Sequence, residues 1–227
     1  MKTIINGLFL NGNFGGIHHT TAQLFNAMHV LSAEVDLLVP QNEVWQGEQY
    51  RKIRPALPGR MGRILCENTH LSSIVNKGGY QVYHSMNYVL PLRSQKFRSV
   101  LTAHDTISLD LPRCCKNTSV LYHGLLMKRS VKQASKVIAV SQKVKEDIIR
   151  HFNTPEDKVE VSYHGIDPIF RQAPARKRLA QVRQQYDLPL PFLLFVGTNE
   201  PKKNQNRLLD AFLAVKKRRR LPHSLVI

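Results

Sequence analysis

The chain has 227 residues, of which 42% are hydrophobic and only 7% aromatic, so it is long enough to bury a core and too apolar to be disordered. Its 33 Lys and Arg against 16 Asp and Glu give a formal net charge of +17, which indicates an anionic partner: a nucleic acid, a membrane surface or a phosphorylated substrate. No run approaches the roughly 18 to 20 apolar residues of a membrane span and no signal-peptide pattern opens the chain, so we expect a cytoplasmic protein.

Apolar segments alternate along the chain with segments of helical periodicity, which is the pattern of a parallel β-sheet covered by helices. Strands are predicted at residues 3–10, 35–39, 81–84, 98–103, 136–140, 158–162 and 192–196. Helices are predicted at 17–32, 64–77, 119–134, 141–152, 175–186 and 204–219. We therefore predict an α/β fold with a parallel sheet and helices on both of its faces.

Prolines interrupt this alternation between about residues 168 and 190, and a domain boundary is predicted there. The first predicted domain is 1–170, the interdomain segment is 171–190, and 191–227 begins a second domain. That last part holds a strand, a glycine-containing loop, a helix and the opening of another strand, SLVI, which is too little for a core of its own.

Two adjacent glycines, Gly15 and Gly16, lie in the first predicted loop, NFGGIHHTTAQLF. They follow an apolar strand and lead directly into a helix. Ligands of parallel sheets gather at the carboxyl ends of the strands. The glycines therefore either make a tight turn or keep the backbone bare, so that a phosphate or a sugar can approach the helix N-terminus.

A second loop of this kind follows the predicted strand at 192–196, in FVGTNEPKKNQNRLLDAF. After Gly197 it carries Lys202 and Lys203, and Asn204 or Asn206 can cap the next helix. Loop amides, a helix dipole and a lysine together suit a diphosphate, although the spacing is not that of a P-loop. The alternative is a solvated lysine pair at the start of a helix.

Four motifs, each after a predicted strand, together resemble the retaining glycosyltransferase family 4, which has the two-domain GT-B architecture. They are GNFGGI, the AHD at 103–105, KVIAVSQKVKEDIIRHFNTPEDKVEVSYHGID at 136–167, and GTNEPKKN. The resemblance implies an N-terminal acceptor-side Rossmann-like domain followed by an incomplete second Rossmann-like domain, the start of the nucleotide-sugar-binding domain. Family members carry two donor-gripping glutamates in a later segment, so we expect little or no transfer by these residues alone.

The resemblance also implies the roles of individual residues. Gly15 and Gly16 would closely approach the donor diphosphate and the reacting sugar, and Lys203 would neutralise the departing nucleotide diphosphate. The family usually has an arginine directly after the glycine that corresponds to Gly197. This chain has Thr198 there, and Lys202 supplies another positive charge nearby.

His104 matches the family histidine at the sugar, where a ring N–H would hydrogen-bond a donor hydroxyl or the acceptor. Asp105 would orient the strand end or cap the next turn. Without the resemblance, His104 can equally be a histidine that only satisfies neighbouring backbone. The predicted site is therefore catalytic His104 and Asp105, donor-binding Gly15, Gly16, Gly197, Thr198, Lys202, Lys203 and Asn204, and cleft-lining His164 and Gly165.

Two structural roles are predicted beside this site. Ser141 is expected to be the N-cap of the helix at 141–152. In YHGIDPIF, Gly165 is expected to permit the backbone geometry of a turn and Asp167 to cap it.

The implied reaction is transfer of a sugar, with mannose as one candidate, from a GDP- or UDP-sugar with retention of configuration. The implied acceptor is a saccharide or lipid-linked saccharide of O-antigen, capsule or other polysaccharide assembly. No cofactor and no metal are expected, and no nucleic acid, because no aromatic RNA-binding motif is interleaved with the basic clusters. Two other classes stay open: a non-catalytic docking module, and another GT-B-like enzyme such as a sugar-nucleotide epimerase.

The basic excess has a candidate use on the predicted apolar helix 119–134, which carries Lys128, Arg129 and Lys132. These residues would face the anionic inner leaflet of the cytoplasmic membrane and make the protein peripheral. The alternative is an ordinary amphipathic helix packed on the sheet.

Overall fold

The computed structural model describes residues 1–10, 15–31, 34–41, 50–53, 59–92 and 96–227. The chain divides into two compact units, Met1–Asp110 with Asn117–His164, and Leu111–Lys116 with Gly165–Ile227. None of the described helices is both long and apolar enough to cross a bilayer.

The first unit is built on a parallel sheet of seven strands in the order β3-β2-β1-β4-β5-β6-β7. From β1 to β3 the strands are added toward one edge of the sheet, and from β4 to β7 they are added toward the other edge. The topological switch point therefore lies between β1 and β4. The strands are β1 (Thr3–Asn6), β2 (Val35–Pro40), β3 (Tyr50–Ile53), β4 (Val82–Ser85), β5 (Arg98–Ala103), β6 (Lys136–Ala139) and β7 (Val159–Val161). The predicted α/β class with a Rossmann-like parallel sheet is confirmed.

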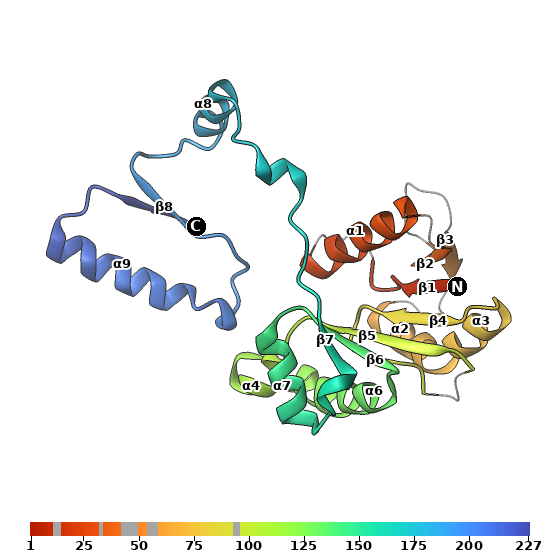
Figure 1. Cartoon of the computed structure of the whole chain (residues 1–227). Coiled ribbons are helices and arrows are strands. Elements are labelled where there is room, and N and C mark those ends of the chain that lie inside the picture. Colours follow the sequence, from red (N-terminus) through yellow and green to blue (C-terminus); the bar gives the residue numbers. More distant parts are fainter. Residues whose placement is uncertain (11–14, 32–33, 42–49, 54–58, 93–95) are drawn as a thin grey trace. The chain divides into compact units, whose positions relative to one another are not determined.

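Helices cover both faces of this sheet because successive strand residues point to opposite sides. In β1, Ile4 belongs to a core shared with α2, α3, α6 and α7, and Ile5 belongs to a second core shared with α1. Figure 1 shows α1 on one side of the sheet and the other four helices on the opposite side. The helices are α1 (Gly16–Val30), α2 (Gly59–Thr69), α3 (Leu71–Lys77), α4 (Ile107–Asp110), α5 (Asn117–Tyr122), α6 (Lys128–Gln133) and α7 (Gln142–Phe152).

The first strand is shorter than predicted and ends at Asn6 instead of continuing to residue 10. The Gly7 amide still donates to the Leu38 carbonyl at 2.8 Å, but the Leu10 amide then turns back to the Gly7 carbonyl at 2.9 Å. A Cβ on Gly7 would lie 2.8 Å from the Leu38 carbonyl oxygen, so the turn needs glycine there. The short edge strand β3 was not predicted, because YRKI lacks an apolar run.

The predicted helix 119–134 is one helical run from 117 to 133 that contains a π-helical turn at His123–Met127. The predicted helix 64–77 is two helices, α2 and α3, which meet at His70. Ser141 caps α7 as predicted, since its hydroxyl oxygen accepts the Val144 amide at 3.2 Å.

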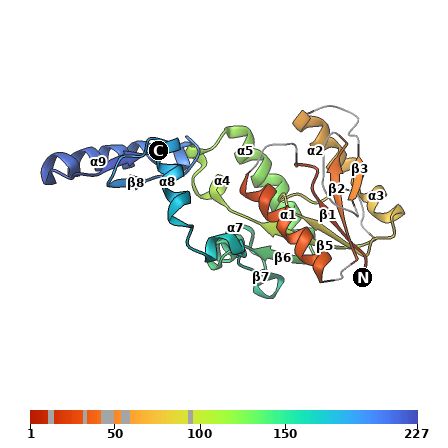
Figure 2. The same cartoon turned by 90° about the horizontal axis from the view of Figure 1, so that it is seen from above.

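The second unit contains a parallel pair, β8 (Phe192–Leu194) and β9 (Ser224–Val226), with α8 (Arg176–Gln185) and α9 (Gln205–Arg219). In Figures 1 and 2, α9 runs beside this pair. Phe212 is the one hydrophobic residue of this fully described unit that is buried, whereas Val196 is 83% exposed and Leu194 63% exposed. The strand predicted from SLVI is confirmed, and the unit has little core of its own.

Candidate functional site

The candidate site of the first unit lies at the carboxyl ends of β1, β4 and β5, around the point where the strand order changes direction. Open α/β sheets bind ligands at such a point. Gly15 and Gly16 follow β1, and His104 and Asp105 follow β5 directly. A residue that sequence reasoning missed, Tyr88, follows β4.

Neither the backbone nor the packing requires glycine at the start of α1. Gly15 is the extended N-cap of α1, with φ −126° and ψ 171°, and as a glycine it has no side chain of its own to cap the helix. A Cβ built on Gly15 or on Gly16 meets no atom of the described residues within 4 Å. Neither glycine has positive φ, and the described residues leave space around both of them in front of the helix N-terminus. Residues 12–14 of the GNFGGI motif lie outside the described residues.

His104 is a neutral imidazole with one unused nitrogen. Burial lowers its pKa to about 4, with help from the neighbouring His164, whose ring centroid is 5.5 Å away. A hydrogen bond to the Met86 backbone raises the pKa and so involves the carbonyl of Met86. Nε2 is buried and has no hydrogen-bond partner among the described residues. Nδ1 therefore donates to Met86, and Nε2 presents a lone pair instead of the ring N–H that the sequence led us to expect.

The turn after His104 is anchored to α4 and α7. Asp105 Oδ1 accepts the Ile107 amide at 3.2 Å and so caps α4. The Thr106 hydroxyl contacts the carboxylates of Asp110 at 2.7 Å and of Asp147 at 3.2 Å. Desolvation alone would raise the pKa of Asp147, but hydrogen bonds from Lys143 and Arg150 lower it, so this carboxylate stays ionised.

A second buried histidine lies beneath this turn. His84 in β4 is 6% exposed, and its Nε2 lies 2.8 Å from the Thr102 hydroxyl oxygen of β5. Burial, followed by the proximity of His104, lowers the pKa of His84 to about 4. Two uncharged imidazoles thus lie at the carboxyl ends of β4 and β5 at neutral pH.

In the second unit, Lys202 forms an ion pair, whereas none is found for Lys203 among the described residues. Glu200 accepts a hydrogen bond from the Thr198 hydroxyl at 3.0 Å and pairs with the Lys202 ammonium at 3.3 Å. No ion pair of Lys203 is found among the described residues, and its side chain is exposed. Lys203 can therefore bind an anion without first breaking an ion pair, whereas Lys202 would have to leave Glu200.

Gly197 and Asn204 differ from what the sequence predicts in detail. A Cβ on Gly197 would lie 3.2 Å from two ring atoms of Phe195, so this glycine has a packing role. Asn204 is the N-cap residue of α9, but its φ of 56° is left-handed and its side chain makes no capping bond. The expected side-chain cap is therefore wrong, and the Asn204 carbonyl instead accepts the Leu208 amide at 3.2 Å.

The YHGIDPIF turn is partly as predicted. His164 is exposed and its ring faces that of His104. Asp167 caps the short 3-10 turn after it, because Oδ1 accepts the Ile169 amide at 3.0 Å. Gly165 does not have positive φ and has open space around it, so the expected need for glycine geometry is not found there.

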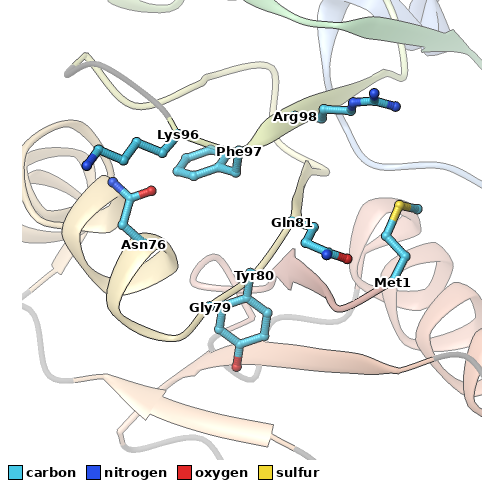
Figure 3. A pocket seen from close by; sticks show the side chains of 8 residues that line it. All are labelled: Met1, Asn76, Gly79, Tyr80, Gln81, Lys96, Phe97 and Arg98. Atoms are coloured by element: carbon cyan, nitrogen blue, oxygen red, sulfur yellow. The ribbon is translucent and has the colours of Figure 1, made fainter.

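A concavity of about 930 Å³ lies elsewhere in the first unit, at the amino ends of the strands. Figure 3 shows the residues that line it, among them Tyr80, Phe97 and Arg98, which precede or begin β4 and β5. We do not assign it a ligand, because the sheet presents its loops and helix N-termini at the opposite edge. Among the described residues, no three His, Cys, Asp or Glu side chains are close enough to hold a metal ion.

Sequence reasoning missed Tyr88 and His123 at this site. The two rings are 5.1 Å apart, and Tyr88 is also 6.0 Å from His104. Asparagine tolerates left-handed backbone better than tyrosine does, yet in this loop Tyr88 and not Asn87 has positive φ, at 59°. Only the tertiary contacts could have pointed to Tyr88.

The sequence matches the model of glycosyltransferase family 4 over residues 14–170, so the chain belongs to this family. It is 29% identical over 148 residues to the O-antigen chain mannosyltransferase B of Escherichia coli, a match that covers 64% of this chain and 38% of the relative. Its fold is similar to that of WaaG, a glycosyltransferase involved in lipopolysaccharide biosynthesis, with a TM-score of 0.67, 16% identity, and coverage of 99% of this chain and 62% of WaaG. It is also similar to Anabaena HepE in complex with UDP-glucose, with a TM-score of 0.64, 16% identity, and coverage of 99% and 59%. The chain therefore spans less than two thirds of the length of each of these proteins.

Proposed function

We propose that the chain is part of a glycosyltransferase that moves a hexose from a nucleoside-diphosphate sugar to a saccharide or lipid-linked saccharide during polysaccharide assembly. The family match over residues 14–170 carries this proposal. Mannose is the favoured sugar, since the curated relative is an O-antigen mannosyltransferase, and transfer with retention is the outcome implied by the resemblance. The UDP-glucose complex of HepE supports a nucleotide sugar as donor.

The chemistry of the first unit suits this reaction. The N-terminus of α1 at Gly15 and Gly16 can offer the first backbone amides of the helix and the positive end of its dipole to an anionic group. The lone pair of His104 Nε2 can accept a hydrogen bond from a sugar hydroxyl. Since His104 is neutral, it supports the sugar without adding a charge beside it.

Breaking the bond between the sugar and the nucleotide leaves negative charge on the diphosphate. A cation held near the diphosphate oxygen that leaves the sugar stabilises the transition state more than the ground state. We assign this role to Lys203, and we propose that residues 191–227 are the start of the nucleotide-binding domain, with 171–190 as the segment that joins it to 1–170.

Calorimetric titration with UDP, GDP, UDP-glucose and GDP-mannose tests this function. We expect one nucleotide family to bind, and Lys203→Ala to weaken that binding by at least about tenfold, because a charge-assisted contact to phosphate is lost. Lys202→Ala is the matched control and should change the affinity less, since Lys202 is paired with Glu200. The assignment of Lys203 fails if both variants bind like the wild type, and donor recognition by residues 1–227 fails if no nucleotide binds.

We also propose that the helical run 117–133 rests on an anionic membrane. Leu121 and Leu125 are 65% and 64% exposed, and Lys128 and Lys132 are exposed further along the run. Arg129, predicted to share this surface, is instead turned inward, where its guanidinium donates to the Pro91 carbonyl at 3.0 Å and burial lowers its pKa.

Co-sedimentation with vesicles that contain phosphatidylglycerol tests this surface. The double variant Lys128→Glu, Lys132→Glu should lose most binding, because each basic side chain near an anionic surface contributes about 1 kcal/mol. The control Lys177→Glu, Lys217→Glu makes the same charge change elsewhere and should bind nearly as well as the wild type. Equal binding by both double variants would mean that net charge alone, and not this helix, attracts the vesicles.

A further inference from the structure

Tyr88 has a backbone conformation that its residue type disfavours. It is one of five described non-glycine residues with positive φ, and three of the others are Asn or Asp, which tolerate this region. The fourth, Arg220, ends an exposed helix. Tyr88 is instead 5% exposed, in the loop after β4. Such a conformation persists in a bulky residue only when its surroundings fix it, and it is found preferentially at functional sites.

The contacts of Tyr88 are with the residues after β5. Its hydroxyl oxygen accepts a hydrogen bond from the Asp105 amide at 3.1 Å. Its ring meets that of His104 edge to face, with centroids 6.0 Å apart and an angle of 75°. Two residues earlier, the backbone of Met86 bonds to the His104 ring. One three-residue segment therefore holds both the imidazole of His104 and the peptide that joins His104 to Asp105.

The Tyr88 ring also contacts an irregular helix. His123 lies 5.1 Å from Tyr88 and opens the π-helical turn, and its Nδ1 is 2.9 Å from the Ser108 hydroxyl oxygen. π-helical turns are rare and are often found at functional sites. Two separate departures from regular backbone, at Tyr88 and at His123, thus meet beside His104.

We propose that Tyr88 is a positioning residue for His104: its hydroxyl fixes the His104–Asp105 peptide and its ring supports the imidazole, so that Nε2 faces the sugar hydroxyl of the donor. The inference rests on the proposed function for the nature of the ligand, but the positioning itself is a property of the free protein. The left-handed backbone of Tyr88 lets a segment this short present both the Met86 carbonyl and the phenol to the same turn.

The test compares Tyr88→Phe with Tyr83→Phe. Tyr83 lies in β4 and is fully buried, and no hydrogen bond from its hydroxyl to the residues that follow β5 is found among the described residues, so the same atom is removed where it does not hold that turn. Hydrogen exchange of the Asp105 amide and the NMR signal of the His104 ring are measured in both variants. Tyr88→Phe should speed the exchange of Asp105 by at least about tenfold and shift the His104 signal, because an amide without its acceptor opens more readily. Tyr83→Phe should do neither.

A titration with the nucleotide sugar that the wild type binds best then separates this proposal from the proposed function. Tyr88→Phe should weaken binding of the nucleotide sugar by at least about threefold but leave binding of the free nucleotide unchanged, since the lost support concerns the sugar. Identical exchange and His104 signals in the two variants would overturn the positioning role, whatever binds. If the wild type binds no nucleotide, donor recognition by residues 1–227 fails, while the Asp105 and His104 measurements still decide whether Tyr88 positions the turn.

Discussion

Acidification from neutral pH to pH 4 is expected to destabilise the folded chain by up to about 3 kcal/mol through His84 alone, since a pKa lowered from 6.5 to about 4 corresponds to that free energy. The sign of this effect follows from proton binding. Between pH 6.5 and about pH 4 the unfolded chain binds a proton at His84 and the folded chain does not, so stability falls as the pH falls. His104, with its pKa also lowered to about 4, acts in the same direction and in the same window.

Urea unfolding at about pH 7.5 and about pH 4.5 measures this effect. In His84→Gln the difference in unfolding free energy between the two pH values should shrink by about 2 to 3 kcal/mol, because glutamine cannot take up the proton. Thr102→Val is the control: it removes the hydroxyl that bonds His84, so it should lower stability at both pH values and preserve the difference. A His84→Gln protein with the full pH dependence of the wild type would show that His84 binds its proton equally well in the folded and unfolded states.

Gly16→Ala is expected to stabilise the fold and at the same time to impair the ligand site. The added Cβ meets no atom of the residues that the structure describes, and Gly16 is the first residue of α1 and does not have positive φ. The unfolding free energy should therefore rise by about 0.5 to 1 kcal/mol. The same methyl group stands in the space that the proposed donor occupies. Affinity for the nucleotide sugar should therefore fall by at least about tenfold.

Thermal unfolding and calorimetry of the same protein samples measure both effects. Asn26→Ala, at an exposed position in the middle of α1, is the matched control, because it should raise helix stability by a similar amount without changing affinity. Unchanged affinity in Gly16→Ala would leave these glycines with a role in starting the helix and no role in binding. A fall in stability would mean that the space around Gly16 is filled.

The local sequence patterns were sufficient for the architecture, and the resemblance of four motifs was sufficient for the family. Continuous apolar segments such as those at β5 and β6 mark buried parallel strands, and the polar residues that follow them mark the edge where ligands bind. Capping by Ser141, Asp105 and Asp167 was predictable for the same reason, because a cap depends on residues two or three positions away. Where the pattern was weak, as in the exposed edge strand β3, prediction failed.

The chemical state of the site depends on contacts between residues far apart in the sequence. His104 is neutral because other segments exclude water from it, and its Nε2 is the unused nitrogen because Met86 takes the other. Arg129 is turned away from the exposed surface by Pro91, and Tyr88 adopts its left-handed backbone between His104 and His123. The sequence by itself determined the α/β fold and the positions of the glycines, histidines and lysines, because periodicity and turn chemistry are local, and the resemblance of its four motifs indicated the family. Only the tertiary structure decided which of these side chains are charged, held or left without a partner, because burial and hydrogen bonding are set by the segments that packing brings together.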